Sequence, residues 1–147
     1  MEAYLIATAC TKFEKKADQP FKSLTEEVYC DLLKSAKVEN GNMIGQAWFG
    51  NCGMGTFGQN NIRGQVCFTP LVQKKLFPER VGIINVEGGC ATGSMAFHGA
   101  WKDVISGTED VSLAIGIEKI YQPNQPEKIQ EIYDAVSYTH LTLPTKA

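Results

Sequence analysis

The 147-residue chain has little of what marks a metal-binding or disulfide-bonded protein. It has two histidines, both far from the early cysteines, and no C-x-x-C pair, so the spacing typical of metal ligands is absent. Five cysteines are an odd number, which argues against a disulfide framework; they are Cys10, Cys30, Cys52, Cys67 and Cys90. We therefore expect no bound metal, and most thiols as small core hydrophobes in a reducing compartment.

Long apolar runs and charge of one sign are also missing. The chain has no apolar run of about 18 residues, which predicts no membrane span. Fourteen basic and 16 acidic residues, a net charge of −2, are mixed along the chain and exclude a basic stripe for nucleic acid or membranes. Glu2 stands where a signal peptide would carry positive charge, so we expect a cytoplasmic protein. Apolar residues make up 44 %, enough for one compact domain with a core.

Apolar patterns along the chain predict alternating strands and helices. Ser23 and Glu26 match a capping box, and Thr69-Pro70 must begin or kink a helix. Gly93 and Gly99 cost a helix about 1 kcal/mol each, which is tolerable where it packs closely on a neighbour. The predicted strands are 4–9, 44–49, 81–86 and 111–117, and the predicted helices are 23–37, 63–76 and 91–105.

The order of these elements indicates the fold class. Strands alternating with helices predict an α/β domain with a mainly parallel sheet and helices on both faces. The runs VGIINV and VSLAIGI are continuous and apolar, which is typical of strands buried on both faces.

The end of the chain has a different character. Residues 121–128 are polar and contain proline, and the final SYTHLTLPTKA has no clean period or caps. That tail resembles a translated adaptor sequence attached to truncated reads. We therefore expect an incomplete, truncated domain over residues 1–135 and a non-native tail over residues 136–147.

The segment INVEGGCATGSMA places Cys90 just after a predicted strand and just before a helix. In open α/β sheets reactive groups gather at the carboxyl ends of strands. Gly88 and Gly89 permit a sharp turn there. A thiol at the amino end of a helix faces unpaired N–H groups and a positive dipole, which favour the thiolate and could hold an oxyanion. From position alone, a buried structural cysteine is an equally good interpretation.

The run VEGGCATGSMA at residues 86–96 resembles the nucleophilic-cysteine segment of the thiolase superfamily, especially the branch of sterol-carrier and lipid-transfer thiolases. The resemblance extends to TKF at residues 11–13, FGQNNIRGQV at 57–66 and VSLAIGIEKI at 111–120. It implies a thiolase-like amino-terminal half. The cysteine segment is the most specific of these pieces, and the others support it through their order and spacing.

In this family a cysteine takes the acyl group from an acyl-CoA thioester, and the resemblance gives that role to Cys90. It implies coenzyme A thioesters as substrates, no tightly bound cofactor, and a homo-oligomer. Family members take an activating histidine from H-P-x-G and an acid/base cysteine from C-x-G, both in their second half. Neither motif occurs in this sequence, so we expect the chain alone to be inactive.

Other candidate residues have simpler interpretations. His98 lies eight residues after Cys90, about 12 Å along one helix, too far for the hydrogen bond that activates a nucleophile. His140 falls in the suspected tail. Glu87 and Glu118 follow predicted strands, and we interpret them as helix caps or salt-bridge partners rather than as an acid/base pair.

The run Gly53–Gly58 matches G-x-G-x-x-G after a strand but lacks the acidic residue at the end of the next strand, so it predicts a turning loop rather than a nucleotide site. Three hypotheses follow. The first is a thiolase-type acyltransferase with one unusually reactive thiol at Cys90. The second is a non-catalytic thiolase-fold fragment that acts as a binding or lipid-transfer-associated subunit. The third is a nucleotide-binding α/β module that uses Gly53–Gly58.

Overall fold

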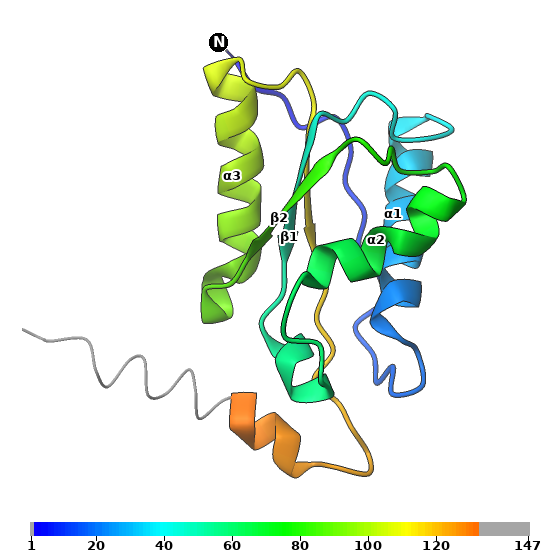
Figure 1. The fold of residues 1–147 in the computed structure, drawn as a ribbon, viewed down its shortest axis with the longest axis vertical. Coiled ribbons are helices and arrows are strands. Elements are labelled where there is room, and N and C mark those ends of the chain that lie inside the picture. The colour runs from blue at the N-terminus through cyan, green and yellow to red at the C-terminus, as the bar shows by residue number, and fades with distance from the viewer. Residues whose placement is uncertain (1, 133–147) are drawn as a thin grey trace, which may run out of the picture.

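The computed structural model describes residues 2–132 and shows an α/β domain (Figure 1). Three parallel strands form one sheet in the order β2-β1-β3. The elements, with η marking short 3₁₀ helices, are α1 (Phe21–Ala36), β1 (Gln46–Gly50), η1 (Gly53–Phe57), α2 (Arg63–Gln73), β2 (Gly82–Val86), η2 (Gly89–Ala91), α3 (Thr92–Ser106) and β3 (Ser112–Gly116). The predicted α/β class and parallel sheet are confirmed.

Helices cover both faces of the sheet. Figure 1 shows α3 on one side and α1 with α2 on the other. The central strand β1 pairs with β2 from Gln46↔Gly82 onward and with β3 from Gln46↔Ser112 onward. Because the three strands run in the same direction, their carboxyl ends meet at one edge of the sheet. That edge brings together the residues that follow 50, 86 and 116.

Aromatic rings fill the core between the sheet and the layer of α1 and α2. Tyr29, Phe49, Phe68 and Phe77 pack edge to face, and the ring centroids of Phe68 and Phe77 are 4.5 Å apart. None of the four is more than 2 % exposed. The Tyr29 hydroxyl donates to the Leu76 carbonyl at 3.1 Å, and burial raises the pKa of Tyr29. These contacts attach both helices to β1.

On the opposite face, α3 packs against β1 so closely that glycine is required. A Cβ atom at Gly99 would lie 2.4 Å from the Trp48 ring, whereas one at Gly93 would meet nothing within 4 Å. The Trp48 indole N–H donates to Asp103 at 2.6 Å, and the Ser112 hydroxyl donates to the same carboxylate at 2.8 Å. The close packing expected of the helix glycines is therefore present at Gly99, and Asp103 joins α3 to both β1 and β3.

The predicted strand at residues 4–9 is wrong. Residues 2–12 form no strand, and no backbone hydrogen bond joins them to another part of the described chain. Tyr4, Leu5 and Ile6 are 68–76 % exposed. The run has the composition of a strand, but a strand exists only where its backbone pairs with a neighbour. The segment instead borders an apolar cavity of about 460 Å³, whose other walls are α1, α3 and β3.

The predicted capping box at the start of α1 is also wrong. The helix begins at Phe21, and its N-cap is Pro20, which is extended with φ −69° and ψ 156°. The Ser23 N–H donates to the Pro20 carbonyl at 3.0 Å, so Ser23 lies inside the first turn. Glu26 forms an ion pair with Lys74, just after α2. The fixed φ of proline suits the position ahead of a helix and moves the start two residues upstream.

The edge strands are less buried than their composition predicts. In β2, Ile84 is 39 % exposed, and Gly82 and Asn85 are also exposed. In β3, Leu113 and Ile115 are buried at alternate positions. Each strand has β1 as its only neighbour in the described sheet. Burial on both faces is therefore wrong for β2, whereas in β3 only Gly116 is exposed. An apolar run does not distinguish the edge of a sheet from its centre.

One predicted boundary, the end of the second helix, can be compared with the structure, and another cannot. The helix α2 runs through Pro70 and stops at Gln73, three residues before the predicted end. The predicted boundary at residues 135 and 136, with the tail after it, lies outside the described residues. Within residues 2–132, no helix is long and apolar enough to span a bilayer.

Candidate active site

Cys90 lies in the short connection between β2 and α3. The strand ends at Val86, the single turn Gly89–Ala91 follows, and α3 begins at Thr92. The thiol is free and the residue is exposed. This is the predicted position, at the carboxyl edge of the sheet and immediately ahead of a helix amino terminus.

The two glycines before Cys90 differ in how strictly the structure requires them. Gly89 has φ +56°, in the left-handed region that side chains with a Cβ rarely adopt. At Gly88 a Cβ atom would lie 2.2 Å from the Met95 Sδ on the first turns of α3. Gly89 therefore provides the backbone conformation of the turn, whereas a Cβ at Gly88 would require only that the partly exposed Met95 side chain move.

Thr92 closes the same turn from the helix side. Its hydroxyl accepts from the Gly88 N–H at 2.9 Å and donates to the Gly89 carbonyl at 2.7 Å. The residue is 7 % exposed, and its Cγ2 lies 3.0 Å from where a Cβ of Gly50 would be. Sequence reasoning missed Thr92; its spacing, two residues after a candidate nucleophile at a helix start, was the available signal.

Asn51 and Glu118 connect the ends of β1 and β3. The Glu118 carboxylate accepts from the Cys52 N–H at 2.9 Å and from the Gly53 N–H at 3.0 Å. The Asn51 side-chain amide donates to the Ile117 carbonyl at 2.6 Å and to Glu118 at 3.3 Å. Glu118 thus caps the amino end of η1, which confirms the capping interpretation. Asn51 is 2 % exposed and was missed from the sequence.

Glu87 acts on the other short helix and on a neighbouring thiol. Its carboxylate accepts from the Gly89 N–H at 2.9 Å, so it caps η2. The Cys52 Sγ lies 3.8 Å from the same carboxylate oxygen. Burial, followed by the negative charges of Glu87 and Glu118, raises the pKa of Cys52. The two carboxylates therefore bind backbone amides separately and suppress ionisation of the Cys52 thiol.

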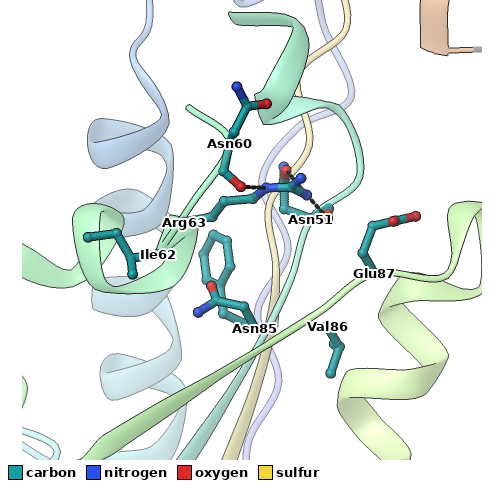
Figure 2. Close-up of a pocket in the computed structure, with 8 residues that line it drawn as sticks. Asn51, Asn60, Ile62, Arg63, Asn85, Val86 and Glu87 are labelled. Atoms are coloured by element: carbon teal, nitrogen blue, oxygen red, sulfur yellow. Dashed lines mark hydrogen bonds between the residues drawn. The ribbon is translucent and has the colours of Figure 1, made fainter. Parts of the chain in front are cut away.

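A hollow of about 200 Å³ opens beside this edge (Figure 2). Arg63 crosses it and donates to the Asn51 carbonyl at 2.8 Å and to the Asn60 carbonyl at 3.4 Å. Figure 2 shows the Glu87 carboxyl pointing away from the Arg63 guanidinium. The lining residues are Phe49, Asn51, Asn60, Ile62, Arg63, Asn85, Val86 and Glu87. Arg63 therefore stabilises the loop after β1, next to the Cys90 turn.

The glycine-rich run Gly53–Gly58 forms the turn η1, and α2 begins only at Arg63. Its first amides are occupied, because those of Cys52 and Gly53 bind Glu118 and that of Met54 binds the Asn51 side chain at 2.9 Å. A phosphate cradle needs such amides free. The structure therefore supports the turning-loop interpretation of this run.

His98 lies on the exposed side of α3. Its ring stacks on Trp101, with centroids 5.5 Å apart and planes at 13°, which agrees with a helix residue that packs rather than activates Cys90. His140 is outside the described residues. All five cysteines are free, but only Cys67 is buried, where burial raises the pKa of its thiol. The expectation that most thiols lie in the core is therefore wrong.

Comparison with known proteins identifies the family. The family model described as "Thiolase, N-terminal domain" matches residues 3–142. The chain belongs to the thiolase family. The thiolase resemblance carried by the Cys90 segment is thus confirmed at the level of the family.

Curated relatives place the chain within only part of a thiolase. It is 32 % identical over 117 residues to the benzoylsuccinyl-CoA thiolase subunit BbsB of Thauera aromatica, which covers 80 % of this chain and 28 % of that protein. It is 31 % identical over 117 residues to the acetyl-CoA acetyltransferase of Methanocaldococcus jannaschii, with 79 % and 28 % covered. The chain therefore aligns with about a quarter of each of these thiolase relatives.

Proposed function

We propose that the thiolase represented by this chain transfers acyl groups from acyl-CoA thioesters, with Cys90 as the nucleophile. One observation carries the proposal: in a chain of the thiolase family, an exposed thiol lies on a glycine turn directly ahead of α3. A thiol at that position meets the amino end of a helix, where negative charge is stabilised.

In the proposed step the Cys90 thiolate attacks the carbonyl carbon of the acyl-CoA. The carbonyl π electrons move to oxygen, then return as the bond between the carbonyl carbon and the coenzyme A sulfur breaks. Coenzyme A leaves as a thiolate that takes up a proton, and the acyl group remains as a thioester on Cys90. The backbone N–H of Cys90 would stabilise the oxyanion. The acyl group then passes to coenzyme A or to the enolate of a second acyl-CoA.

Among residues 2–132, no histidine or second reactive thiol is placed to act as acid or base on Cys90. His98 is stacked on Trp101, and the Cys52 thiol lies beside the Glu87 carboxylate. The H-P-x-G and C-x-G motifs do not occur in this sequence. We therefore propose that the second half of the thiolase supplies these groups, that the chain alone does not turn over, and that no tightly bound cofactor is needed beyond the acyl-CoA substrate.

Exposed apolar side chains support assembly with further protein. Met95, Phe97 and Trp101 on α3 are 41–54 % exposed, and Ile84 on the edge strand β2 is 39 % exposed. Apolar groups gathered on a surface mark interaction sites. We propose that the parent thiolase is a homo-oligomer that covers part of this surface. A binding subunit without activity would have the same fold with an unreactive Cys90.

Limited alkylation tests the nucleophile. The chain is treated with substoichiometric iodoacetamide near neutral pH, and the modified peptides are quantified by mass spectrometry. We expect Cys90 to react about tenfold faster than Cys10, which is also an exposed free thiol but does not precede a helix. Equal rates at the two thiols would contradict the acyltransferase proposal and support a binding subunit without activity.

A further inference from the structure

Thr92 is one of few buried polar side chains in the described part of the chain, and both of its hydroxyl hydrogen bonds go to the glycines before Cys90. A threonine at a helix start commonly accepts from an amide further along the helix. Here the hydroxyl accepts from the Gly88 N–H and donates to the Gly89 carbonyl, both upstream of Cys90. The hydroxyl therefore serves the turn that carries the thiol.

The bonds of Thr92 form part of a closed set around Cys90. The Thr92 N–H donates to the Gly89 carbonyl, and the Ala91 N–H donates to the Gly88 carbonyl at 3.0 Å. The residues on both sides of Cys90 in the sequence are thus hydrogen-bonded to one another. The direction of the Cys90 side chain depends on the conformation of Gly89, which has φ +56°. The Thr92 hydroxyl stabilises that conformation by donating to the Gly89 carbonyl.

The hydroxyl is better placed for this than the other side chain on the turn. Glu87 also binds the Gly89 N–H, but that contact is exposed, so water competes with it. Thr92 is 7 % exposed, and its methyl packs against β1 at Gly50. The Thr92 hydrogen bonds are part-buried, so water replaces them less readily than it replaces the exposed Glu87 contact.

We propose that Thr92 is a positioning residue for the Cys90 nucleophile. The inference rests on the proposed function and deepens it. The hydroxyl holds the Gly88–Gly89 backbone so that the Cys90 thiolate and the Cys90 N–H face the same approaching thioester carbonyl. A thiolate attacks faster when its direction is fixed before the electrophile arrives, so loss of this bond reduces the reactivity of Cys90 without removing any group that touches the substrate.

The test compares Thr92→Ala with Thr92→Ser in the full chain. Both variants lose the methyl, and they differ only in the hydroxyl. The readout is the rate of Cys90 alkylation by iodoacetamide against pH, measured together with the thermal melt. We expect Thr92→Ser to stay within about twofold of the parent rate. Thr92→Ala should react about tenfold more slowly near pH 7.

Thr25 provides a matched control. It is also a buried threonine, and its hydroxyl donates to the Phe21 carbonyl within α1 at 2.8 Å. Thr25→Ala should lower the melting temperature and leave the Cys90 curve unchanged. If Thr92→Ala does not melt cooperatively, Thr92→Val, which keeps the volume of the side chain, takes its place.

The outcomes separate the two proposals. Fast alkylation of Cys90 in the parent, slow in Thr92→Ala and restored in Thr92→Ser, supports the positioning role. Fast alkylation in the parent with identical curves for Thr92→Ala and Thr92→Ser overturns the role of Thr92 and leaves the nucleophile intact. A parent chain in which Cys90 reacts no faster than Cys10 overturns the proposed function and the inference with it.

Discussion

Two of the five thiols lie at the carboxyl edge of the sheet, and they differ in their exposure. Cys52 follows β1 and has the Glu87 carboxylate 3.8 Å from its sulfur. Burial and the charges of Glu87 and Glu118 raise the pKa of Cys52, so its thiolate forms only at higher pH. Cys90 follows β2 on an exposed turn. Reactivity at this edge is therefore expected at Cys90 and suppressed at Cys52.

Replacing Glu87 tests this difference. Glu87→Gln removes one negative charge and one hydrogen-bond acceptor beside the Cys52 thiol, which lowers its raised pKa toward the ordinary value. More thiolate is then present at pH 8, and we expect Cys52 to be alkylated about twofold faster, the scale of a partly exposed charge pair. Glu79→Gln, at an exposed loop position, is the control. Slower alkylation of Cys52 in Glu87→Gln would show that Glu87 favours the thiolate instead.

Among the elements, α3 contains two glycines that sequence alone treats as equivalent. In the structure Gly99 faces the Trp48 ring at 2.4 Å from its missing Cβ, whereas Gly93 faces open space. The same substitution should therefore have opposite effects at the two positions.

Urea unfolding of Gly99→Ala and Gly93→Ala measures this. We expect Gly99→Ala to lower the free energy of unfolding by about 1–3 kcal/mol, because the added methyl overpacks the contact with β1. Gly93→Ala should raise it by up to about 1 kcal/mol through helix propensity. A destabilised Gly93→Ala of similar size would mean that the space beside Gly93 is filled in solution.

Most elements could be predicted from the sequence because their own residues determine them. The strands at β1, β2 and β3 follow from short apolar runs, and α3 follows from its periodic apolar positions. The strand at residues 4–9 could not be excluded, because its absence depends on pairing with other strands. The start of α1 depended on Pro20, which competes with the Ser23 capping box.

The candidate site also has features that could be predicted from the sequence and features that could not. Cys90 and its two glycines are adjacent in sequence between a strand and a helix, so they could be predicted together. The contact between Asn51 and Glu118 could not, because it joins residues 67 apart through the register of β1 and β3. Thr92 is near in sequence, but its hydroxyl binds the turn only because Gly89 adopts a positive φ.

On the scale of the whole molecule, protection of backbone amides against hydrogen exchange should depend on how many neighbours each strand has. The central strand β1 is paired on both sides, β2 and β3 are paired on one, and residues 4–9 are paired on none. Amide hydrogen exchange should therefore be slowest in β1, where exchange requires global unfolding, and fastest in residues 4–9. Equal protection of residues 4–9 and β1, measured by mass spectrometry of peptic fragments, would show that the amino-terminal segment pairs as a strand.

The central position of β1 also determines when this domain can fold during synthesis. Its partners lie far downstream: Gln46 bonds to Gly82 across 36 residues, and Asn51 bonds to Ile117 across 66. At roughly 5–20 residues per second, a ribosome needs about 3–13 s to add the latter interval. Until β3 has been added, Trp48 and Phe49 belong to a strand with at most one of its two partner strands available. The nascent chain therefore carries an incompletely paired aromatic strand for seconds, an interval in which chaperones and aggregation compete for it.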